Sequence, residues 1–422
     1  MNFLLCCLNF DFLREHHSSF EIIILLVSTI GNNHLKSEET ESPEYKGFEQ
    51  GPIRPPSEAD SLLIRVTRNC PWNRCAFCPV YKKSRFSLRP VEHVIKDIDT
   101  VHRHVAALLR LADEADKRGR IEIDTAELKI KPEERQAFNA AYHWVACGMK
   151  SIFIQDANSL IIKPSDLIEI LQHLKHCFPW VERITSYARS HTVARISDSE
   201  LSAIRAAGLN RIHIGLESGS DKVLEMVKKG VSKETQIKAG QKAKKAGFEL
   251  SEYVMPGLGG IKLSSDHALE TADALNQINP DFIRLRTLAI PENITLYDEF
   301  KAGRFEKCSD VIMAKEILLF IENLNGIYSI IKSDHILNLF EDVEGTLPRD
   351  KEKIINVLRT FLDMPQKSQI TYQIGRRLGI FSRLSDMQNN QRLENAEKAC
   401  ISLGITPENV DKIVDELMQR FV

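Results

Sequence analysis

The feature that most constrains the fold of this chain is a regular alternation of short apolar runs with longer amphipathic segments, beginning at residue 61. The runs have the length and composition of strands, and the segments between them have the 3.6-residue period of helices. Strands that alternate with helices form a parallel sheet with right-handed crossovers. The sequence therefore predicts an α/β fold, a partial (β/α)6 barrel of parallel strands. The predicted strands are 62–66, 151–155, 183–188, 211–216, 249–255 and 282–288.

Three segments differ in composition. Residues 1–55 are partly apolar, then polar and proline-rich, and we expect a poorly ordered extension and linker. Residues 56–298 hold the barrel, with a helical insert from about 91 to 147. Residues 299–422 lose the strand pattern, and we expect a helical C-terminal region without strands. Its predicted helices are 312–324, 334–343, 351–362, 367–378, 387–403 and 407–421.

The fourth predicted strand indicates which of its faces looks into the barrel. Its isoleucine and leucine side chains share one face, which we expect to meet the helix layer. The other face carries Arg211, His213, Gly215 and Glu217. The sequence therefore predicts a barrel lined with polar groups, and chemistry in such barrels collects at the C-terminal strand ends. His213 is either a paired interior histidine or a proton donor to a substrate.

Three cysteines follow the first predicted strand, Cys70, Cys75 and Cys78, in a C-x4-C-x2-C spacing. Three thiolates this close together can hold one metal centre, but a closed tetrahedral site needs a fourth ligand. An iron–sulfur cluster held by three cysteines keeps one iron open to a substrate or cofactor. The alternative is a structural zinc site completed by a histidine such as His93. Zinc sites usually pair two C-x-x-C units and this sequence has no second pair, so iron–sulfur is favoured.

The remaining composition restricts location and partners. Cys147, Cys177, Cys308 and Cys400 are scattered singly among apolar residues, which is typical of buried free thiols in a reducing cytoplasm. No apolar run is long enough to span a bilayer, so no membrane association is expected. The formal net charge is −2, which gives no global basic field, and no DNA partner is expected.

The region 61–290 resembles the radical S-adenosylmethionine (radical SAM) superfamily. The resemblance rests on the cysteine triplet with Phe77 before its last cysteine, on the six-unit barrel, and on the segments 211–221 and 253–260. These two segments are similar to the branch that contains tRNA-modifying enzymes and coproporphyrinogen oxidase. Two features depart from the family pattern. The usual spacing is C-x3-C-x2-C, and the family's Gly-Gly-Glu segment appears here as Gln155, Asp156 and Ala157.

The resemblance implies a [4Fe–4S] cluster on the three cysteines and S-adenosylmethionine (SAM) on its open iron. It further implies reductive cleavage of SAM to a 5′-deoxyadenosyl radical, which takes a hydrogen atom from a substrate. Asp156 would take over the role of the family glutamate, Arg189 would bind the SAM carboxylate, and the other contacts would surround the amine, ribose and adenine. The implied cofactor contacts are Phe77, Gln155, Asp156, Arg189, Glu217, Ser218, Met255, Pro256, Gly257 and Arg286.

Several alternatives stay open at this stage. Arg189 taken alone is also a candidate for a strand-end salt bridge, while Arg284 and Arg286 could bind an anionic substrate or pair with interior acids. The chain could be a non-catalytic cluster- and SAM-binding scaffold or regulator, or an RNA-modifying enzyme. Its substrate could be a small molecule, a peptide or RNA. We expect an electron donor of the flavodoxin or ferredoxin type.

Overall fold

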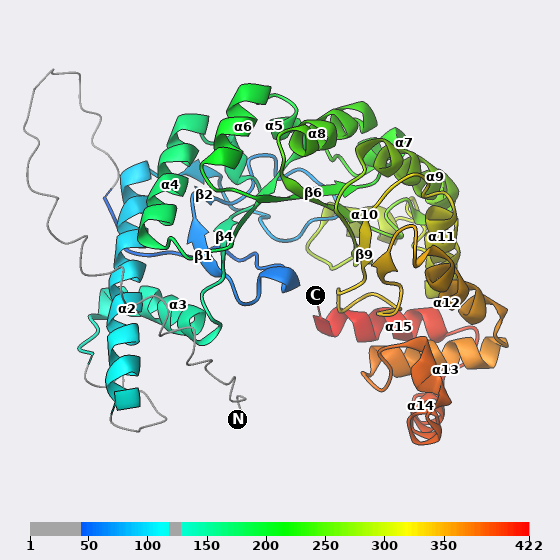
Figure 1. Cartoon of the computed structure of the whole chain (residues 1–422). Helices are drawn as coiled ribbons and strands as arrows, with labels where there is room; N and C mark the ends of the chain where they lie inside the picture. Colours follow the sequence, from blue (N-terminus) through cyan, green and yellow to red (C-terminus); the bar gives the residue numbers. More distant parts are fainter. Residues whose placement is uncertain (1–43, 118–127, 422) are drawn as a thin grey trace, which may run out of the picture.

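The computed structural model describes residues 44–117 and 128–421, and its centre is a curved, mostly parallel sheet (Figure 1). Six strands run parallel in chain order, as the sequence predicts, and two short strands extend the sheet at one edge. The strands are β1 (Leu62–Arg65), β4 (Ser151–Gln155), β5 (Arg183–Ala188), β6 (Arg211–Glu217), β7 (Glu249–Val254), β8 (Phe282–Leu285), β9 (Ile330–Lys332) and β10 (Gly345–Thr346).

Helices cover the convex face of the sheet, and the concave face is the barrel interior (Figure 1). The predicted apolar face of β6 is confirmed, because Ile212, Ile214 and Leu216 are buried in the main apolar core. The core helices are α2 (Val91–Lys117), α3 (Arg135–Ala146), α4 (Pro164–Cys177), α5 (Ser190–Val193), α6 (Asp198–Ala206), α7 (Asp221–Met226), α8 (Lys233–Lys245), α9 (Gly260–Ile278) and α10 (Thr295–Lys301). Single 3-10 turns are η2 (Pro56–Glu58), η4 (Pro132–Glu134) and η5 (Ser159–Ile161). In the part of the chain described, no helix has the length and apolarity needed to cross a membrane.

The region after residue 299 packs on the barrel and is mostly helical, but it contains two strands that the prediction lacks. β9 adds a parallel strand beside β8, and β10 pairs antiparallel with β9. The buried ion pair between Arg377 and Asp310, 2.7 Å apart, joins two of its helices. These helices and turns are α11 (Asp310–Glu322), α12 (Lys351–Asp363), α13 (Gln366–Arg377), η6 (Leu384–Gln388), α14 (Asn390–Ser402), α15 (Val410–Met418) and η7 (Gln419–Phe421).

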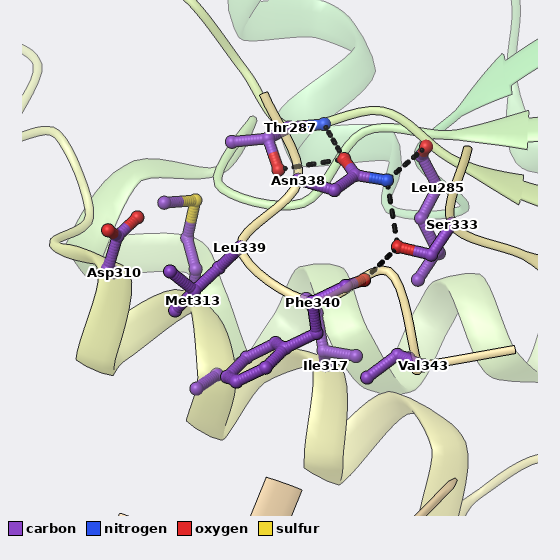
Figure 2. A pocket seen from close by; sticks show the side chains of 11 residues that line it. Leu285, Thr287, Asp310, Met313, Ile317, Ser333, Asn338, Leu339, Phe340 and Val343 are labelled. Carbon is purple, nitrogen blue, oxygen red and sulfur yellow. Dashed lines mark hydrogen bonds between the residues drawn. The ribbon is translucent and has the colours of Figure 1, made fainter. Parts of the chain in front are cut away.

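The predicted helix over 334–343 is wrong, because this segment folds as turns around the side chain of Asn338 (Figure 2). The Asn338 amide oxygen accepts from the Thr287 N–H and hydroxyl, each at 3.0 Å, and its amide nitrogen donates to the Leu285 carbonyl at 2.9 Å. These bonds fasten the segment to the end of β8. The buried apolar residues of the segment are therefore covered by contacts with distant elements and not by one face of a helix; they are Leu337, Leu339, Phe340 and Val343.

Glu58, on η2, fills the floor of the barrel. Its carboxylate accepts from the Ser61 hydroxyl at 2.6 Å and lies 3.5 Å from Nε2 of His213. The rings of Phe153, Tyr187 and Tyr253 surround the His213 ring at 6.4, 5.4 and 5.6 Å between centroids. His213 therefore lies inside the barrel beside Glu58, and neither of its ring nitrogens has a hydrogen-bond partner among the described residues. Glu58 is a partner that periodicity did not reveal.

Burial lowers the pKa of His213 from 6.5 to about 4, although the neighbouring Glu58 opposes that shift. An unfolded chain therefore takes up a proton on this imidazole between about pH 6.5 and 4, while the folded chain does not, so acid favours unfolding in that window. At pH 5 this single group costs about 2 kcal/mol of stability relative to pH 7.

We predict that His213→Gln, which keeps a donor for Glu58, makes the thermal midpoint less sensitive to pH between 7 and 5. Thermal unfolding at the two pH values measures this. The matched control is His143→Gln, at an exposed histidine, which should keep the wild-type pH dependence. An unchanged pH dependence in His213→Gln would contradict the assignment.

Candidate functional site

The three predicted metal ligands lie together on one loop at the C-terminal end of β1. A small antiparallel ladder of β2 (Thr67–Arg68) and β3 (Ser87–Leu88) closes the base of this loop. Asn69 and Asn73 adopt the left-handed backbone region, with φ of 68° and 46°, which asparagine tolerates better than most residues. The Asn73 amide donates to the Tyr81 carbonyl at 2.6 Å and so holds the loop across its width. The metal-ligand candidates, all half-buried free thiols, are Cys70, Cys75 and Cys78.

A single buried carboxylate, that of Asp156, fixes both ends of the cysteine loop. It accepts from the Asn69 N–H, next to Cys70, at 3.0 Å, and from the Tyr81 hydroxyl, beyond Cys78, at 2.9 Å. The Arg65 guanidinium adds contacts of 2.8 and 2.7 Å. Asp156 is fully buried and follows β4 directly. Its side chain is occupied by the protein, so Asp156 positions the cysteine loop.

The side chain of Gln155 is also occupied. Its amide oxygen accepts from the Gly51 N–H at 2.8 Å, and its amide nitrogen donates to the Ile53 carbonyl at 2.6 Å. A Cβ on Gly51 would lie 2.1 Å from the Asp156 carboxylate, so only glycine allows the backbone at this position to lie so close to Asp156. Gln155 therefore holds the segment that leads into the barrel, and any cofactor contact from this position must come from its backbone.

Trp72 lies in the longer spacing between Cys70 and Cys75. Its indole N–H donates to the Lys228 carbonyl at 2.8 Å, and Gly230 leaves no room for a Cβ, which would lie 2.2 Å from the ring. The guanidinium carbons of Arg74 and Arg189 lie 5.1 and 5.0 Å from the ring centroid. Trp72 thus anchors the longer loop to the segment after β6 and stacks against Arg189. Spacing alone did not reveal this role.

Arg189 lies at the end of β5, close to the thiols. Its guanidinium donates to the Lys229 carbonyl at 2.7 Å, and within residues 44–117 and 128–421 no carboxylate lies within 4.0 Å of it. Burial lowers the pKa of Arg189, while the charges of Cys75 and Cys70 raise it. The strand-end salt bridge that the sequence left open is therefore not formed among these residues.

A second cation, Lys229, was missed by the sequence analysis. Its ammonium lies 3.1 Å from the Glu217 carboxylate and 5.7 Å from the centroid of Phe77. Burial raises the pKa of Cys75, while the charges of Lys229 and Arg189 lower it. Burial also raises the pKa of Cys78. Two cations facing buried thiols favour a negatively charged metal–thiolate centre over free thiols.

The predicted contacts that follow β6 and β7 in the chain are already bonded within the protein. The Ser218 hydroxyl is buried and lies 2.8 Å from Nδ1 of His267 and 3.0 Å from the Ser220 N–H, so it is already occupied. The Gly257 N–H donates to the Glu316 carboxylate at 2.7 Å. The carbonyl oxygens of Met255 and Pro256 accept from His267 and from the Leu288 N–H, each at 3.1 Å.

Arg284, on β8, and Arg286, just after it, have different kinds of partner. Arg284 pairs with Asp334 and bonds the Ser251 hydroxyl, as expected of a structural ion pair. The Arg286 guanidinium lies 4.2 Å from the centroid of Tyr253 and donates to the Tyr187 hydroxyl at 3.4 Å. Within the described ranges it has no carboxylate within 4.0 Å. Burial acts to lower the pKa of Arg286, but the surrounding tyrosines and carboxylates raise it, so it stays charged.

The donor set fits an iron–sulfur cluster better than a single ion. In the described residues, the triplets of ligand atoms that lie within 4.8 Å of one another do not include these three sulfurs. Sulfurs bound to one tetrahedral zinc ion lie about 3.8 Å apart, whereas each cysteine of a cluster binds a different iron. His93 lies on α2 with its ring against Tyr45, 5.3 Å between centroids, and among the described residues it is in no group of ligand atoms that lie within 4.8 Å of one another.

Residues 64–272 match the sequence family described as the radical SAM superfamily. This region, about half of the chain, therefore belongs to the superfamily, whose members are enzymes that use a [4Fe–4S] cluster and SAM.

The chain is similar to several named proteins over part of its length. It is 29% identical over 111 residues to the tRNA uridine(34) acetyltransferase of Methanocaldococcus infernus, which is 26% of this chain and 21% of that protein. It is 29% identical over 237 residues to the 4'-phospho-dehydrooxetanocin synthase of Priestia megaterium, 51% of this chain and 26% of that protein. The chain thus spans about a quarter of the length of these curated relatives. Coproporphyrinogen III oxidase from Escherichia coli is a structural neighbour, with a TM-score of 0.42, 14% identity, and coverage of 63% of this chain and 52% of that one.

We predict that Asp156→Asn weakens iron binding, because the amide loses the charge that holds Arg65, Asn69 and Tyr81 together. Each lost charge-assisted bond costs about 1.5–3 kcal/mol. Iron per chain after anaerobic reconstitution should fall to about half or less, while far-UV circular dichroism stays unchanged.

The matched control is Asp97→Asn. Asp97 is equally buried and is likewise held by an arginine, Arg89, and a tyrosine, Tyr45, but it contacts no residue of the cysteine loop 70–78. It should keep wild-type iron. Equal iron loss in both variants would show that Asp156 acts only through general stability.

Proposed function

We propose that Cys70, Cys75 and Cys78 hold three irons of a [4Fe–4S] cluster and that SAM binds at the fourth. When bound, this pair supplies a 5′-deoxyadenosyl radical that takes a hydrogen atom from the substrate. The observation that carries the proposal is the loop itself: three thiols, fixed at both ends by Asp156 and faced by Arg189 and Lys229, at the mouth of a barrel. A three-cysteine set leaves one coordination position for a ligand that is not protein.

Each wall of the site has a distinct task in this proposal. Arg189 receives the SAM carboxylate, because its guanidinium is close to the thiols, held in place by Trp72, and unpaired with any carboxylate of the described residues. Glu217, oriented by Lys229, receives the ribose hydroxyls. Phe77 and the backbone of 254–257 flank the adenine. The occupied side chains of Gln155, Asp156 and Ser218 act through the backbone they position.

The substrate enters the barrel interior below these groups. The Tyr253 hydroxyl is buried there without a hydrogen-bond partner in the described structure, next to Arg286 and Tyr187. A buried unpaired hydroxyl costs about 1–3 kcal/mol, which a bound substrate recovers. A small molecule, a peptide segment or an unpaired nucleotide could supply the partner. The tRNA-acting relatives favour RNA as the second candidate.

We infer a cytoplasmic location and a flavodoxin- or ferredoxin-type electron donor. The seven described cysteines are free, which favours a reducing compartment, and reductive cleavage of SAM requires one electron from a donor outside the chain.

The direct test is release of 5′-deoxyadenosine from SAM by anaerobically reconstituted, reduced protein. We predict release by wild type and none by Cys75→Ala, because two cysteines do not retain the cluster. The matched control Cys308→Ala, at another buried free thiol, should keep both activity and the brown colour. A scaffold or regulator would bind the cluster and SAM but release no 5′-deoxyadenosine in the wild type.

We predict that Arg189→Ala weakens SAM binding about 10- to 100-fold, the value of a charge-assisted contact, and leaves iron per chain unchanged. Equilibrium dialysis with SAM and iron analysis measure the two effects. The matched control is Arg195→Ala, at a nearby exposed arginine, which should change neither SAM binding nor iron per chain. Loss of iron or of the fold in Arg189→Ala would indicate that stacking on Trp72 is its main role.

A further inference from the structure

A second group of metal-ligand side chains lies on the outer helix layer, between α2 and α4, which run side by side (Figure 1). Nε2 of His173 lies 2.7 Å from a carboxylate oxygen of Asp99 and 3.5 Å from the sulfur of Cys177. The three ligand atoms all lie within 4.8 Å of one another. A nitrogen, an oxygen and a sulfur at these separations can bind one ion with small side-chain movements.

The helical spacing explains why the group converges. His173 and Cys177 are four residues apart on α4 and therefore share one face of that helix. Asp99 is on the neighbouring helix α2. Cys177 is buried, His173 is half-buried and Asp99 is exposed, so the group leads from the core to the solvent. An ion could reach it from outside.

Two further imidazoles lie near this group. The ring of His176 lies 6.4 Å from that of His173, and His102, one turn after Asp99, packs edge-on against Phe178. Burial lowers the pKa of His102. His102 and His176 therefore lie close to the three side chains whose ligand atoms meet, but outside that group.

We propose that Asp99, His173 and Cys177 form a binding site for a zinc-class divalent transition metal, with His102, His176 or water in the fourth position. A mixed set of nitrogen, sulfur and oxygen ligands suits zinc, which is bound tetrahedrally by cysteine, histidine and carboxylate groups. Binding forms the metal–sulfur bond and releases the thiol proton to solvent. The ion would link helix α2 to helix α4, and its role would be separate from that of the cysteine loop.

A similar group, Asp60, His143 and Cys147, offers a rival location in the described part of the chain. Asp60 and His143 are exposed, and Nε2 of His143 already lies 3.1 Å from the Ala59 carbonyl. Metal binding there would displace that contact. The group on α2 and α4 has no such competing backbone contact at His173 and has extra imidazoles, so the proposal rests on it.

The test is a zinc titration of chelator-treated protein that still carries its iron–sulfur cluster, with a chromophoric chelator as competitor. We expect one equivalent of zinc to bind, and Cys177→Ser and Asp99→Asn each to weaken that binding at least 10-fold with iron per chain unchanged. Asp99 is exposed, so Asp99→Asn should not disturb the fold even if Cys177→Ser does. Zinc should also raise the thermal midpoint of wild type, because a ligand that binds only the folded state stabilises it.

The matched control is Cys147→Ser, in the rival group, which should bind zinc as wild type does. The proposal is overturned if wild type binds no zinc, if Asp99→Asn binds it unchanged, or if Cys147→Ser alone abolishes binding. The titration measures zinc and not SAM cleavage, so its outcome is independent of the proposed radical chemistry.

Discussion

The buried carboxylate of Asp156 is the interaction on which the functional end of this protein depends. It accepts from Arg65, from the backbone before Cys70 and from Tyr81 after Cys78, and it comes from the end of the neighbouring strand β4. A loop that carries three thiols would otherwise be free to rearrange or to oxidise. Because one charge fixes both of its ends to the sheet, the geometry of the thiols is set by the barrel.

Buried polar groups lie at both ends of the barrel interior. At the floor, Glu58 and His213 lie 3.5 Å apart within a group of aromatic rings. Arg189 and Arg286 have no carboxylate partner in the described residues, and the buried Tyr253 hydroxyl beside Arg286 has no hydrogen-bond partner there. Buried polar groups without partners are costly, and they concentrate where the protein must meet a ligand.

The sequence predicted the six parallel strands, because the alternation of short apolar runs with amphipathic segments is a local signal. It also placed the cysteines at a strand end. It did not predict the contacts of Trp72, Lys229 and Glu58, because they join segments far apart in the chain. Trp72 bonds Lys228, Lys229 faces Phe77, and Glu58 lies beside His213. The predicted helix over 334–343 was wrong for the same reason. Asn338 bonds to residues at the end of β8, and no local sequence pattern indicates such a contact. His173 and Cys177 carried a usable signal, a four-residue spacing on one helix face.

The measurement that tests the central claim most directly is electron paramagnetic resonance of the anaerobically reduced protein, recorded without and with SAM. If three cysteines leave one iron open to SAM, the reduced protein shows an iron–sulfur signal whose g values and shape change when SAM is added. A missing iron–sulfur signal, or one that SAM leaves unaltered at saturating concentration, would contradict the account.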